Sequence, residues 1–411
     1  MRKIVLLIAA LFALATGPAL ARPLTVLISI DGFRADYLGR GVTPNMSAMA
    51  AGGASAAMRP SFPSKTFPNH YALITGLRPD RNGIVENSME DPAIPGVSFK
   101  MSNHDAVVDR RWWDQGEPLW VTAEKVGIRS ATMFWPGSEA PVHGVRPSLW
   151  LPFDQSRSAE ARVDQVLSWA DLPLDQRPQF ITLYFDDVDT MGHTYGPEST
   201  EVNVAATRVD AAIGRLETGL RARGLEANIV VVADHGMAAI SEDRQLFIED
   251  HVAAGTFRTL GTGAFMTIVP LPGKEEIVDK ALVGSHEHLT CWRRGQFPAR
   301  FHYGHNPRVA PIFCLPQTGW TVYSRARKPN GGEKGTHGFD PAAPEMAAVF
   351  VASGPAFRAG VRLRTFDNVD VYPLVARLAG IEAQPGDGHL HPLRGALKPK
   401  DRTGSSLGQA H

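Results

Sequence analysis

Residues 229–236 have the sequence Ile-Val-Val-Val-Ala-Asp-His-Gly, an apolar run followed directly by two possible metal ligands and a glycine. Residues 24–32, Leu-Thr-Val-Leu-Ile-Ser-Ile-Asp-Gly, repeat this arrangement, and a third apolar run covers Phe180 to Phe185. Apolar runs without strict alternation are typical of strands that are covered on both faces of a parallel sheet. Leu24 to Ile30, Phe180 to Phe185 and Ile229 to Ala233 are therefore predicted to be strands of one sheet.

Helical segments separate these strands. The clearest one covers about Glu201 to Arg223, where apolar residues recur at helical spacing and Gly224 offers a stop. Met346 to Ser353 is a further candidate strand, and Val369 to Leu378 is a candidate late helix. Strands that alternate with helices predict an α/β fold, a doubly wound and mostly parallel sheet that is sandwiched by helices.

The pattern changes from Phe247 to Tyr323, where short apolar segments surround a basic and aromatic-rich stretch. We interpret residues 247–323 as a smaller subdomain that is inserted into the catalytic core. The core itself is then expected to comprise residues 22–246 and 324–397, followed by a flexible tail at residues 398–411.

The first 21 residues have the pattern of a secretory signal peptide, with a basic start, an apolar stretch from Ile4 to Ala15 and a small-residue cleavage site after Ala21. The apolar stretch is shorter than the roughly 20 residues that a spanning helix needs, so we expect export to the periplasm and no transmembrane anchor. In an oxidising compartment Cys291 and Cys314 can form a disulfide. Two buried thiols are the alternative.

Charge and composition exclude some classes of partner. The chain has 42 basic and 42 acidic residues, and removal of the first 21 residues takes away two basic residues and leaves a formal charge of −2. This balance gives no basic footprint for a nucleic acid as a stable partner. With 44% hydrophobic residues the chain is an ordinary globular protein. Its oligomeric state does not follow from the sequence.

Potential metal ligands follow the predicted strands. Asp31 comes directly after the run from Leu24 to Ile30, and Asp234 and His235 come directly after the run from Ile229 to Ala233. In parallel sheets of this kind, ligands bind in the crevice that is formed by the loops at the carboxyl ends of the strands. We therefore expect these three side chains to converge on one edge of the sheet. The simpler alternative for Asp234 is a helix cap.

Three further candidates lie elsewhere in the chain. Asp189 and His193 are four residues apart, so on a helical turn their side chains would face the same way and could bind one ion. His337 lies between glycines, which let the backbone approach an ion closely. Each residue alone could be a cap, a surface histidine or a loop tip. Together they predict a pair of metal ions, and mixed carboxylate and imidazole ligands suit zinc best, with manganese or iron next.

Thr66 is the candidate nucleophile. It precedes Phe67 and Pro68 and an apolar stretch that ends at Gly76, which predicts that it lies where a helix begins. Free backbone N–H groups and the helix dipole favour a phosphoryl oxygen there. A threonine hydroxyl is a poor nucleophile alone, and a bound metal would supply the activation. An ordinary cap is the alternative. The Gly-x-Ser-x-Gly match at residues 404–408 lies in the predicted flexible tail and not in the strand-to-helix elbow of a serine hydrolase.

These residues resemble the nucleotide pyrophosphatase/phosphodiesterases of the alkaline phosphatase superfamily. The resemblance extends over most of the mature chain and implies an alkaline phosphatase-like fold and hydrolysis of phosphodiester or pyrophosphate bonds. Its markers are residues 29–34, 65–70, 75–77, 82–84, 134–137, 189–193, 233–237 and 335–338.

The resemblance also implies the roles of the site residues. Thr66 would attack phosphorus, form a phosphothreonine and release, after attack by water, a phosphate monoester such as a nucleoside 5′-monophosphate. Two Zn2+ ions per chain would assist this reaction. One would be bound by Asp189, His193 and His337, and the other by Asp31, Asp234, His235 and the Thr66 oxygen.

Four residues are candidates for substrate binding. Asn87 matches the position whose amide steadies a phosphoryl oxygen, although from its local sequence alone it is a turn residue. Phe67 matches an aromatic that stacks on a small-molecule substrate, commonly on a nucleobase, and core packing is its alternative. Trp150 or Phe153 is the candidate for a second stacking aromatic.

Three residues depart from the pattern or modify it. Thr336 stands where many relatives have an acidic residue, so the outer support of His337 does not follow from the resemblance. Asp186 is a reserve ligand. Lys65, next to Thr66, is expected to point away from the site if the segment is extended, whereas a helical turn would undo this expectation. Without an added cation near Thr66, diesters and pyrophosphates are favoured over monoesters.

Two other functions remain open at this point. A phosphodiesterase of lysophospholipid or choline-phosphate headgroups would need an aromatic and acidic pocket for a quaternary ammonium group. A non-catalytic periplasmic zinc-binding protein would use Thr66 only as a helix cap. Sulfatase chemistry is disfavoured because the Cys/Ser-x-Pro-x-Arg pattern is absent around Thr66.

Overall fold

The computed structural model describes residues 22–327 and 332–399. The predicted signal peptide at residues 1–21 and most of the predicted tail therefore lie outside the described residues. The first tail residue is attached to the core, because the backbone N–H of Lys398 donates to the carbonyl of Ala356 at 2.9 Å. Within the described ranges, no helix has the length and apolar character to cross a membrane.

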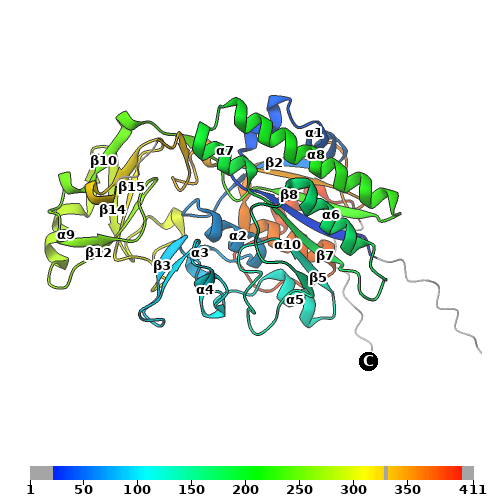
Figure 1. The fold of residues 1–411 in the computed structure, drawn as a ribbon, viewed down its shortest axis with the longest axis horizontal. Coiled ribbons are helices and arrows are strands. Elements are labelled where there is room, and N and C mark those ends of the chain that lie inside the picture. The colour runs from blue at the N-terminus through cyan, green and yellow to red at the C-terminus, as the bar shows by residue number, and fades with distance from the viewer. Residues whose placement is uncertain (1–21, 328–331, 400–411) are drawn as a thin grey trace, which may run out of the picture.

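A nine-stranded sheet forms the centre of the larger part of the molecule (Figure 1). Its middle strand β1 pairs in parallel with β7 on one side and β8 on the other, and β7 continues in parallel to β5 and then β6. On the other side β18 is antiparallel to both β8 and β2. The strands are β1 (Leu24–Ile30), β2 (Ala54–Arg59), β5 (Ser130–Met133), β6 (Leu149–Trp150), β7 (Phe180–Phe185), β8 (Ala227–Val232), β18 (Ala348–Ser353), β19 (Val361–Arg362) and β20 (Phe366–Asp367).

Helices cover both faces of this sheet, which confirms the predicted doubly wound, mostly parallel α/β architecture. The long helix α8 packs against α1, α6 and α7, and α10 packs against α2 and β1 on the opposite side (Figure 1). Every residue of β1 and β7 is buried, as expected for central strands between two helical layers. The helices are α1 (Pro44–Gly52), α2 (Thr66–Thr75), α5 (Leu119–Lys125), α6 (Ala159–Ala170), α7 (Asp187–Tyr195), α8 (Thr200–Ala222) and α10 (Val371–Ala379).

Some predicted boundaries shift for local reasons. The strands from Leu24 and from Phe180 have the predicted bounds, and β8 starts two residues earlier than predicted and ends at Val232. The predicted strand from Met346 begins at Ala348, because Met346 belongs to a 3₁₀ turn. The late helix likewise begins at Val371, after a 3₁₀ turn that contains Val369.

A second, five-stranded sheet lies beside the main body, at the left of Figure 1. All its neighbouring strands are antiparallel, and it has a separate apolar core that includes Met266, Ile268 and Ile312. It lies within the segment for which a subdomain is predicted. Its elements are β11 (Phe257–Thr259), β12 (Met266–Pro270), α9 (Glu275–Leu282), β13 (Gly284–His286), β14 (Leu289–Arg293) and β15 (Ile312–Pro316), and nearby β10 (Gln245–Phe247) pairs with β16 (Thr321–Tyr323).

Cys291 and Cys314 form a disulfide in this smaller sheet. The two residues lie opposite each other on the antiparallel strands β14 and β15, and both are buried. The disulfide joins positions that are 23 residues apart in the sequence. The predicted disulfide is therefore confirmed, and the alternative of two buried thiols is wrong.

Replacement of both cysteines by alanine should lower the free energy of unfolding by about 3 kcal/mol, because a loop of this length no longer restricts the unfolded chain. Urea denaturation of the parent and the double variant measures the difference. Reduction of the parent should reproduce the effect of the double variant. Equal stability of all three forms would show that the bond contributes nothing.

Candidate active site

The candidate ligands meet at the carboxyl ends of the central strands. Asp31 directly follows β1, and Asp234 and His235 follow β8 after one further residue. Because β1 and β8 are parallel neighbours with Ser29 opposite Val232, Asp31 and Asp234 emerge at the same edge. Asp189 also lies at this edge, on the helix that directly follows β7.

Asp31, Asp234 and His235 form the first of two clusters, which we call cluster A. All three side chains are buried, and one ligand atom of each lies within 4.8 Å of the others. The Nε2 atom of His235 is 2.9 Å from Oδ2 of Asp234 and 3.4 Å from Oδ1 of Asp31. Cluster A thus presents two carboxylates and one imidazole to a single point.

Asp189, His193 and His337 form the second cluster, cluster B, under the same 4.8 Å limit. Asp189 and His193 lie one turn apart on α7, as predicted, with Oδ2 and Nε2 3.4 Å apart. His337 contributes Nε2 at 3.7 Å from the other carboxylate oxygen of Asp189. Its ring stacks on that of His235 with centroids 3.5 Å apart, so clusters A and B lie side by side.

The protonation of the three histidines follows from their neighbours. Each Nδ1 lies at 2.8 or 2.9 Å from a backbone carbonyl, which can only accept, so in the neutral ring Nδ1 holds the proton and Nε2 has the lone pair. Each Nε2 lone pair therefore faces carboxylate oxygens. The carbonyls belong to Gly335 for His193, Gly236 for His235 and Ser64 for His337.

One oxygen of each carboxylate lacks a hydrogen-bond partner. Among the described residues, Oδ1 of Asp31, Oδ1 of Asp189 and Oδ2 of Asp234 are buried without a hydrogen bond. Burial, followed by repulsion from the neighbouring carboxylates, raises the pKa of both Asp31 and Asp234 well above its usual value. Burial also lowers the pKa of His235 and His337, so both imidazoles are neutral. Clusters A and B fit divalent cations, which supply the missing positive charge.

A set of outer partners orients cluster A. Tyr184 donates its hydroxyl hydrogen to Oδ2 of Asp31 at 2.7 Å. His70 donates from Nδ1 to the carbonyl of Thr66 at 2.8 Å and lies 3.4 Å from Oδ2 of Asp234. The Nε2 of His70 accepts from Ser29 Oγ at 2.8 Å, and burial lowers the pKa of His70 to about 3. Such contacts fix the direction of metal ligands.

These outer residues have no function that their local sequence predicts. His70 lies four residues after Thr66 on the same helix, so helical spacing could have linked the two. Ser29 and Tyr184 are opposite each other on β1 and β7. That relation depends on the strand register, which no local signal in the sequence gives.

Thr66 lies next to cluster A. It is the first residue of α2, it is buried, and its hydroxyl oxygen is 3.4 Å from Nε2 of His235. The helix ends at Gly76 in the left-handed conformation, as the sequence indicates. Asn87 is attached to the start of α2, because its side-chain oxygen accepts the backbone N–H of Phe67 at 3.0 Å. The side-chain NH2 group of Asn87 is therefore the part of this side chain that can donate a hydrogen bond to a ligand.

The three candidate stacking residues lie in different environments. Phe67 is half-buried and contacts Phe99 and Trp113, each with ring centroids 5.9 Å apart. Phe153 is exposed over 48% of its surface, and its ring lies 6.0 Å from that of Tyr184, which holds Asp31. Trp150 lies on the edge strand β6, with the Arg146 guanidinium 5.3 Å from its ring. Phe153 therefore reaches cluster A indirectly through Tyr184, whereas Trp150 contacts Arg146.

Three details of the sequence analysis need correction or completion. Lys65 does not point away, because its ammonium donates to the carbonyl of His337 at 3.2 Å and so lies beside cluster B. Asp186 is outside both clusters, since one carboxylate oxygen pairs with Arg162 at 2.8 Å and the other accepts from Gln155 at 2.9 Å. The outer support of His337 comes from the Ser64 carbonyl, which makes an acidic residue at position 336 unnecessary.

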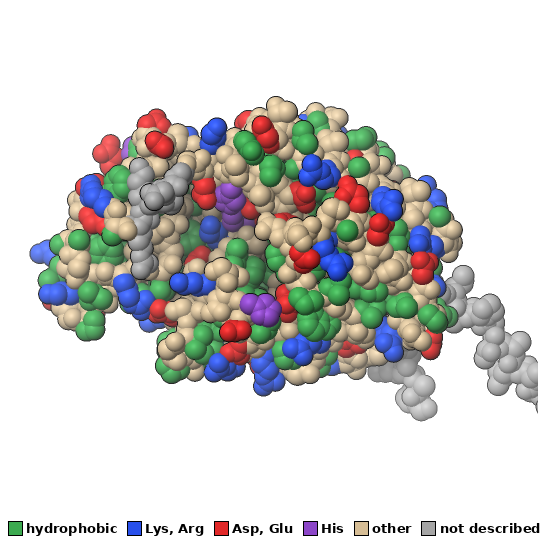
Figure 2. Space-filling model, viewed as in Figure 1, with side chains coloured by type: hydrophobic (Ala, Val, Ile, Leu, Met, Phe, Trp, Pro, Cys, Tyr) green, Lys and Arg blue, Asp and Glu red, His purple; other side chains and the backbone are tan. Residues whose placement is uncertain are grey.

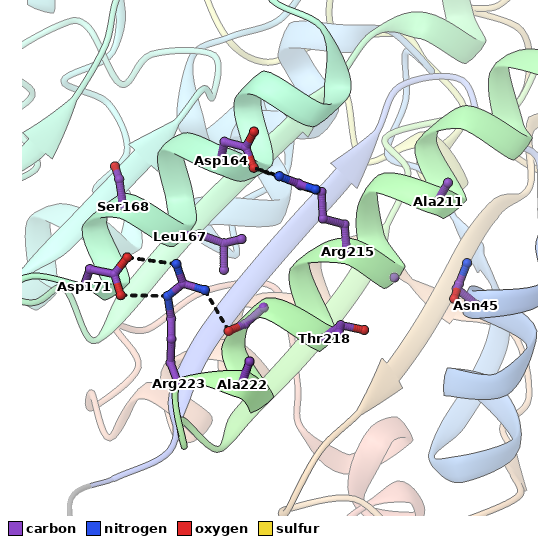
Figure 3. A pocket seen from close by; sticks show the side chains of 12 residues that line it. Asn45, Asp164, Leu167, Ser168, Asp171, Ala211, Arg215, Thr218, Ala222 and Arg223 are labelled. Atoms are coloured by element: carbon purple, nitrogen blue, oxygen red, sulfur yellow. Dashed lines mark hydrogen bonds and ion pairs between the residues drawn. The ribbon is translucent and has the colours of Figure 1, made fainter.

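Surface shape agrees with this location. Figure 2 shows a hollow between the smaller and the larger part of the molecule, with histidine and charged side chains exposed inside it. A different cavity, of about 710 Å³, lies between α6 and α8 (Figure 3). Ion pairs of Arg215 with Asp164 and of Arg223 with Asp171 line it, and it contains no residue of either cluster. We assign no chemistry to it.

The comparison with known proteins decides the family. The model of the type I phosphodiesterase/nucleotide pyrophosphatase family matches residues 25–340. The chain belongs to this family. Its resemblance in sequence is therefore confirmed, and the chain is a phosphodiester hydrolase and nucleotide diphosphatase of the alkaline phosphatase-like fold.

Individual relatives are similar over nearly the whole chain. An uncharacterized pyrophosphatase/phosphodiesterase of Schizosaccharomyces pombe is 37% identical over 88% of this chain and 78% of its own length. The bis(5′-adenosyl)-triphosphatase of Xenopus laevis is 34% identical over 90% of this chain and 80% of its own length. A solved structure of murine ectonucleotide pyrophosphatase/phosphodiesterase 5, an inactive threonine-to-alanine variant with AMP, has a TM-score of 0.86 and 31% identity, and the match covers 92% of this chain and 100% of that one.

The raised pKa values give a pH-dependent prediction. Without cations, the protonated forms of Asp31 and Asp234 contribute to the free energy of unfolding. This contribution is fully present below the unfolded pKa of about 3.9, and it is lost as the pH rises through the raised pKa values of the folded state. A divalent cation such as Zn2+ would need both carboxylates ionised, so an increase in melting temperature on addition of Zn2+ is expected to be larger near pH ~8 than near pH ~5.5.

Thermal melts with Zn2+ and with EDTA at both pH values measure this effect. In the Asp234→Asn variant, most of the increase in melting temperature on addition of Zn2+ should be absent. Asp187→Asn, a control on α7 outside both clusters, should keep it. An increase that is independent of pH, or equal in the two variants, would contradict the assignment of the clusters.

Proposed function

We propose that the chain hydrolyses phosphodiester and pyrophosphate bonds of nucleotides with Thr66 as the nucleophile and two Zn2+ ions as cofactors. The observation that supports this most directly is the position of the Thr66 hydroxyl, 3.4 Å from a histidine whose lone pair faces two buried carboxylates. A threonine that only capped a helix would not need a histidine and two buried carboxylates beside it. The threonine-to-alanine change in the inactive murine relative gives further support.

The two clusters are the proposed cation sites. Cluster B would hold one ion, and cluster A with the Thr66 oxygen would hold the other. When bound, such ions lower the pKa of a coordinated hydroxyl and neutralise charge on phosphoryl oxygens. Carboxylate oxygens combined with imidazole nitrogens favour Zn2+ over Mg2+ or Ca2+.

The residues of the chain then perform the transfer in two steps. The Thr66 oxygen attacks phosphorus, an oxygen–phosphorus bond to Thr66 forms, and the bond to the leaving oxygen breaks. Water attacks the phosphothreonine in the second step, and the Thr66 oxygen leaves. The product is a phosphate monoester, such as a nucleoside 5′-monophosphate.

Backbone and side-chain donors around Thr66 would bind the phosphoryl group. As the first residue of α2, Thr66 has a backbone N–H without an acceptor inside the helix, and the helix dipole adds partial positive charge there. The Asn87 amide nitrogen is the second donor, since its oxygen is occupied by the N–H of Phe67. Lys65 adds a cation near cluster B, so the proposed preference for diesters rests on the family and not on an absent charge.

Nucleotides are the proposed substrates. Relatives of the chain include a bis(5′-adenosyl)-triphosphatase and a structure with bound AMP. Phe67 and Phe153 are the aromatic side chains proposed to contact the base. Phe67 directly follows Thr66 in α2, and Phe153 lies beside Tyr184, which donates to Asp31. Choline-phosphate esters are the less favoured substrates, because the names of these relatives point to nucleotides.

We also propose that the chain is exported and cleaved after Ala21. The signal-like residues 1–21 and the disulfide both suit an oxidising compartment such as the periplasm. N-terminal sequencing of the exported protein tests the cleavage site. A mature chain that still begins at Met1 would contradict it.

Thr66→Ala should reduce kcat on p-nitrophenyl thymidine 5′-monophosphate on the order of 10³-fold or more, because no other hydroxyl takes over the attack. Thr66→Ser should retain measurable turnover. Thr75→Ala, at the other end of α2, is the control and should remain active. Metal analysis should find about two zinc ions per chain in every variant. Parent-like turnover by Thr66→Ala would exclude the proposed nucleophile.

Substrate class is tested by the ratio of kcat/KM for p-nitrophenyl thymidine 5′-monophosphate to that for p-nitrophenylphosphorylcholine. A ratio well above one, on the order of tenfold or more, is expected because each aromatic contact to the base contributes about 1 kcal/mol. Phe153→Ala should lower this ratio. A ratio below one would favour the headgroup phosphodiesterase instead.

A further inference from the structure

Residues 303–308 connect the smaller sheet to the main body, and we call this segment the clamp. It follows the 3₁₀ turn Ala299–Phe301 and precedes β15 of the smaller sheet. It forms hydrogen bonds with Arg111, Trp112 and Gln115 of the main body and with the region of residues 80–91. The part of this region from Gly83 to Asp91 contains Asn87, and we call it the Asn87 segment.

One end of the clamp is fixed at Asp80, just before the Asn87 segment. The Asp80 carboxylate accepts the consecutive backbone N–H groups of Gly304, His305 and Asn306, each at 2.9 Å. The side chain of Asn306 also donates to the backbone carbonyl of Asp80 at 3.1 Å. Hydrogen bonds to a charged acceptor are the stronger kind, so this end of the clamp is firmly placed.

The other end of the clamp is fixed by Arg308, whose side chain is buried. Its guanidinium donates to the carbonyl of Gly83 at 2.8 Å and to the carboxylate of Asp91 at 2.6 Å. It therefore joins the first and the last residue of the Asn87 segment. A buried and fully bonded arginine of this kind holds two chain segments in one relative position.

Tyr303 makes the contact closest to Asn87. Its hydroxyl donates to the carbonyl of Val85 at 3.1 Å, two residues before Asn87. The ring is buried among Phe62, Phe297 and Phe313, at centroid distances of 5.1 to 6.0 Å. The hydroxyl therefore bonds to the Asn87 segment from a rigid aromatic support.

We infer that the clamp is a positioning element for Asn87, with Tyr303 as the positioning residue. The inference rests on the proposed role of Asn87 in binding a phosphoryl oxygen. The side-chain oxygen of Asn87 is fixed by Phe67, next to the nucleophile, and its backbone is held by contacts of the clamp at Gly83, Val85 and Asp91. The smaller sheet thus takes part in the reaction without contacting the substrate.

A double-mutant cycle with Tyr303→Phe and Asn87→Ala tests this inference on the zinc-loaded full chain, with p-nitrophenyl thymidine 5′-monophosphate as substrate. Asn87→Ala should lower kcat by about 10²-fold, as removal of one oxyanion donor does. Tyr303→Phe, which removes one buried hydrogen bond, should lower kcat by about 3- to 10-fold with little change in KM. In the Asn87→Ala background, the Tyr303 change should have almost no further effect.

Two further measurements separate positioning from a loss of stability. Tyr303→Phe should speed hydrogen–deuterium exchange in residues 83–91, whereas Tyr372→Phe should not. Tyr372 is the matched control, because its buried hydroxyl accepts the backbone N–H of Gln384 and contacts neither the clamp nor the Asn87 segment. Tyr372→Phe should keep parent kcat despite its lost hydrogen bond.

Each outcome of the cycle decides a different point. Full additivity of the two changes, or a parent-like kcat for Tyr303→Phe, would overturn the inference and leave the role of Asn87 intact. Parent-like activity of Asn87→Ala would overturn both the role of Asn87 and the inference. The Thr66→Ala result remains independent, so failure of the proposed nucleophile is recognised separately.

Discussion

Repulsion between buried ligand atoms dominates this structure. In cluster A the unprotonated Nε2 of His235 lies 2.9 Å from a carboxylate oxygen of Asp234 that has no hydrogen bond among the described residues. Two lone pairs at this distance, away from water, are unfavourable unless a cation lies between them or a proton is added. The fold holds these atoms together nevertheless, because they extend from central strands in which every side chain except that of Ala227, the first residue of β8, is buried. The free energy of unfolding is thus lowered by the residues of the candidate active site.

The central strands and the helix α2 bring the clusters and Thr66, the proposed nucleophile, into one place. Parallel pairing of β1 with β7 and β8 sets Asp31, Asp189 and Asp234 at one edge, and His70 connects Asp234 to the backbone of Thr66. His70 thereby places the start of α2 next to cluster A. The smaller sheet reaches the same region from the opposite side through its clamp. Catalytic geometry therefore depends on both parts of the molecule.

Much of this arrangement could be predicted from the sequence. The bounds of β1 and β7 follow from their unbroken apolar runs, and the shared face of Asp189 and His193 follows from their spacing on a helix. Both clusters contain the residues that the sequence indicated as ligands. These features depend on local periodicity and on the rule that parallel strands present their ends at one edge.

The contacts that support the site could not be predicted in this way. The Ser64 carbonyl that orients His337 is 273 residues away in the sequence, and Tyr303 and Val85 are 218 residues apart. Such pairs depend on how separate elements pack, and no local pattern encodes them. The expected direction of Lys65 was wrong for a related reason, because its long side chain follows the position of the His337 carbonyl and not the alternation of an extended segment.

The most direct test of the central claim is a crystal structure of the zinc-loaded protein with anomalous diffraction measured on both sides of the zinc absorption edge. The account predicts two anomalous peaks per chain, one bonded to Asp31, Asp234 and His235 and the other to Asp189, His193 and His337. A single peak, or peaks that are not bonded to these six residues, would contradict it.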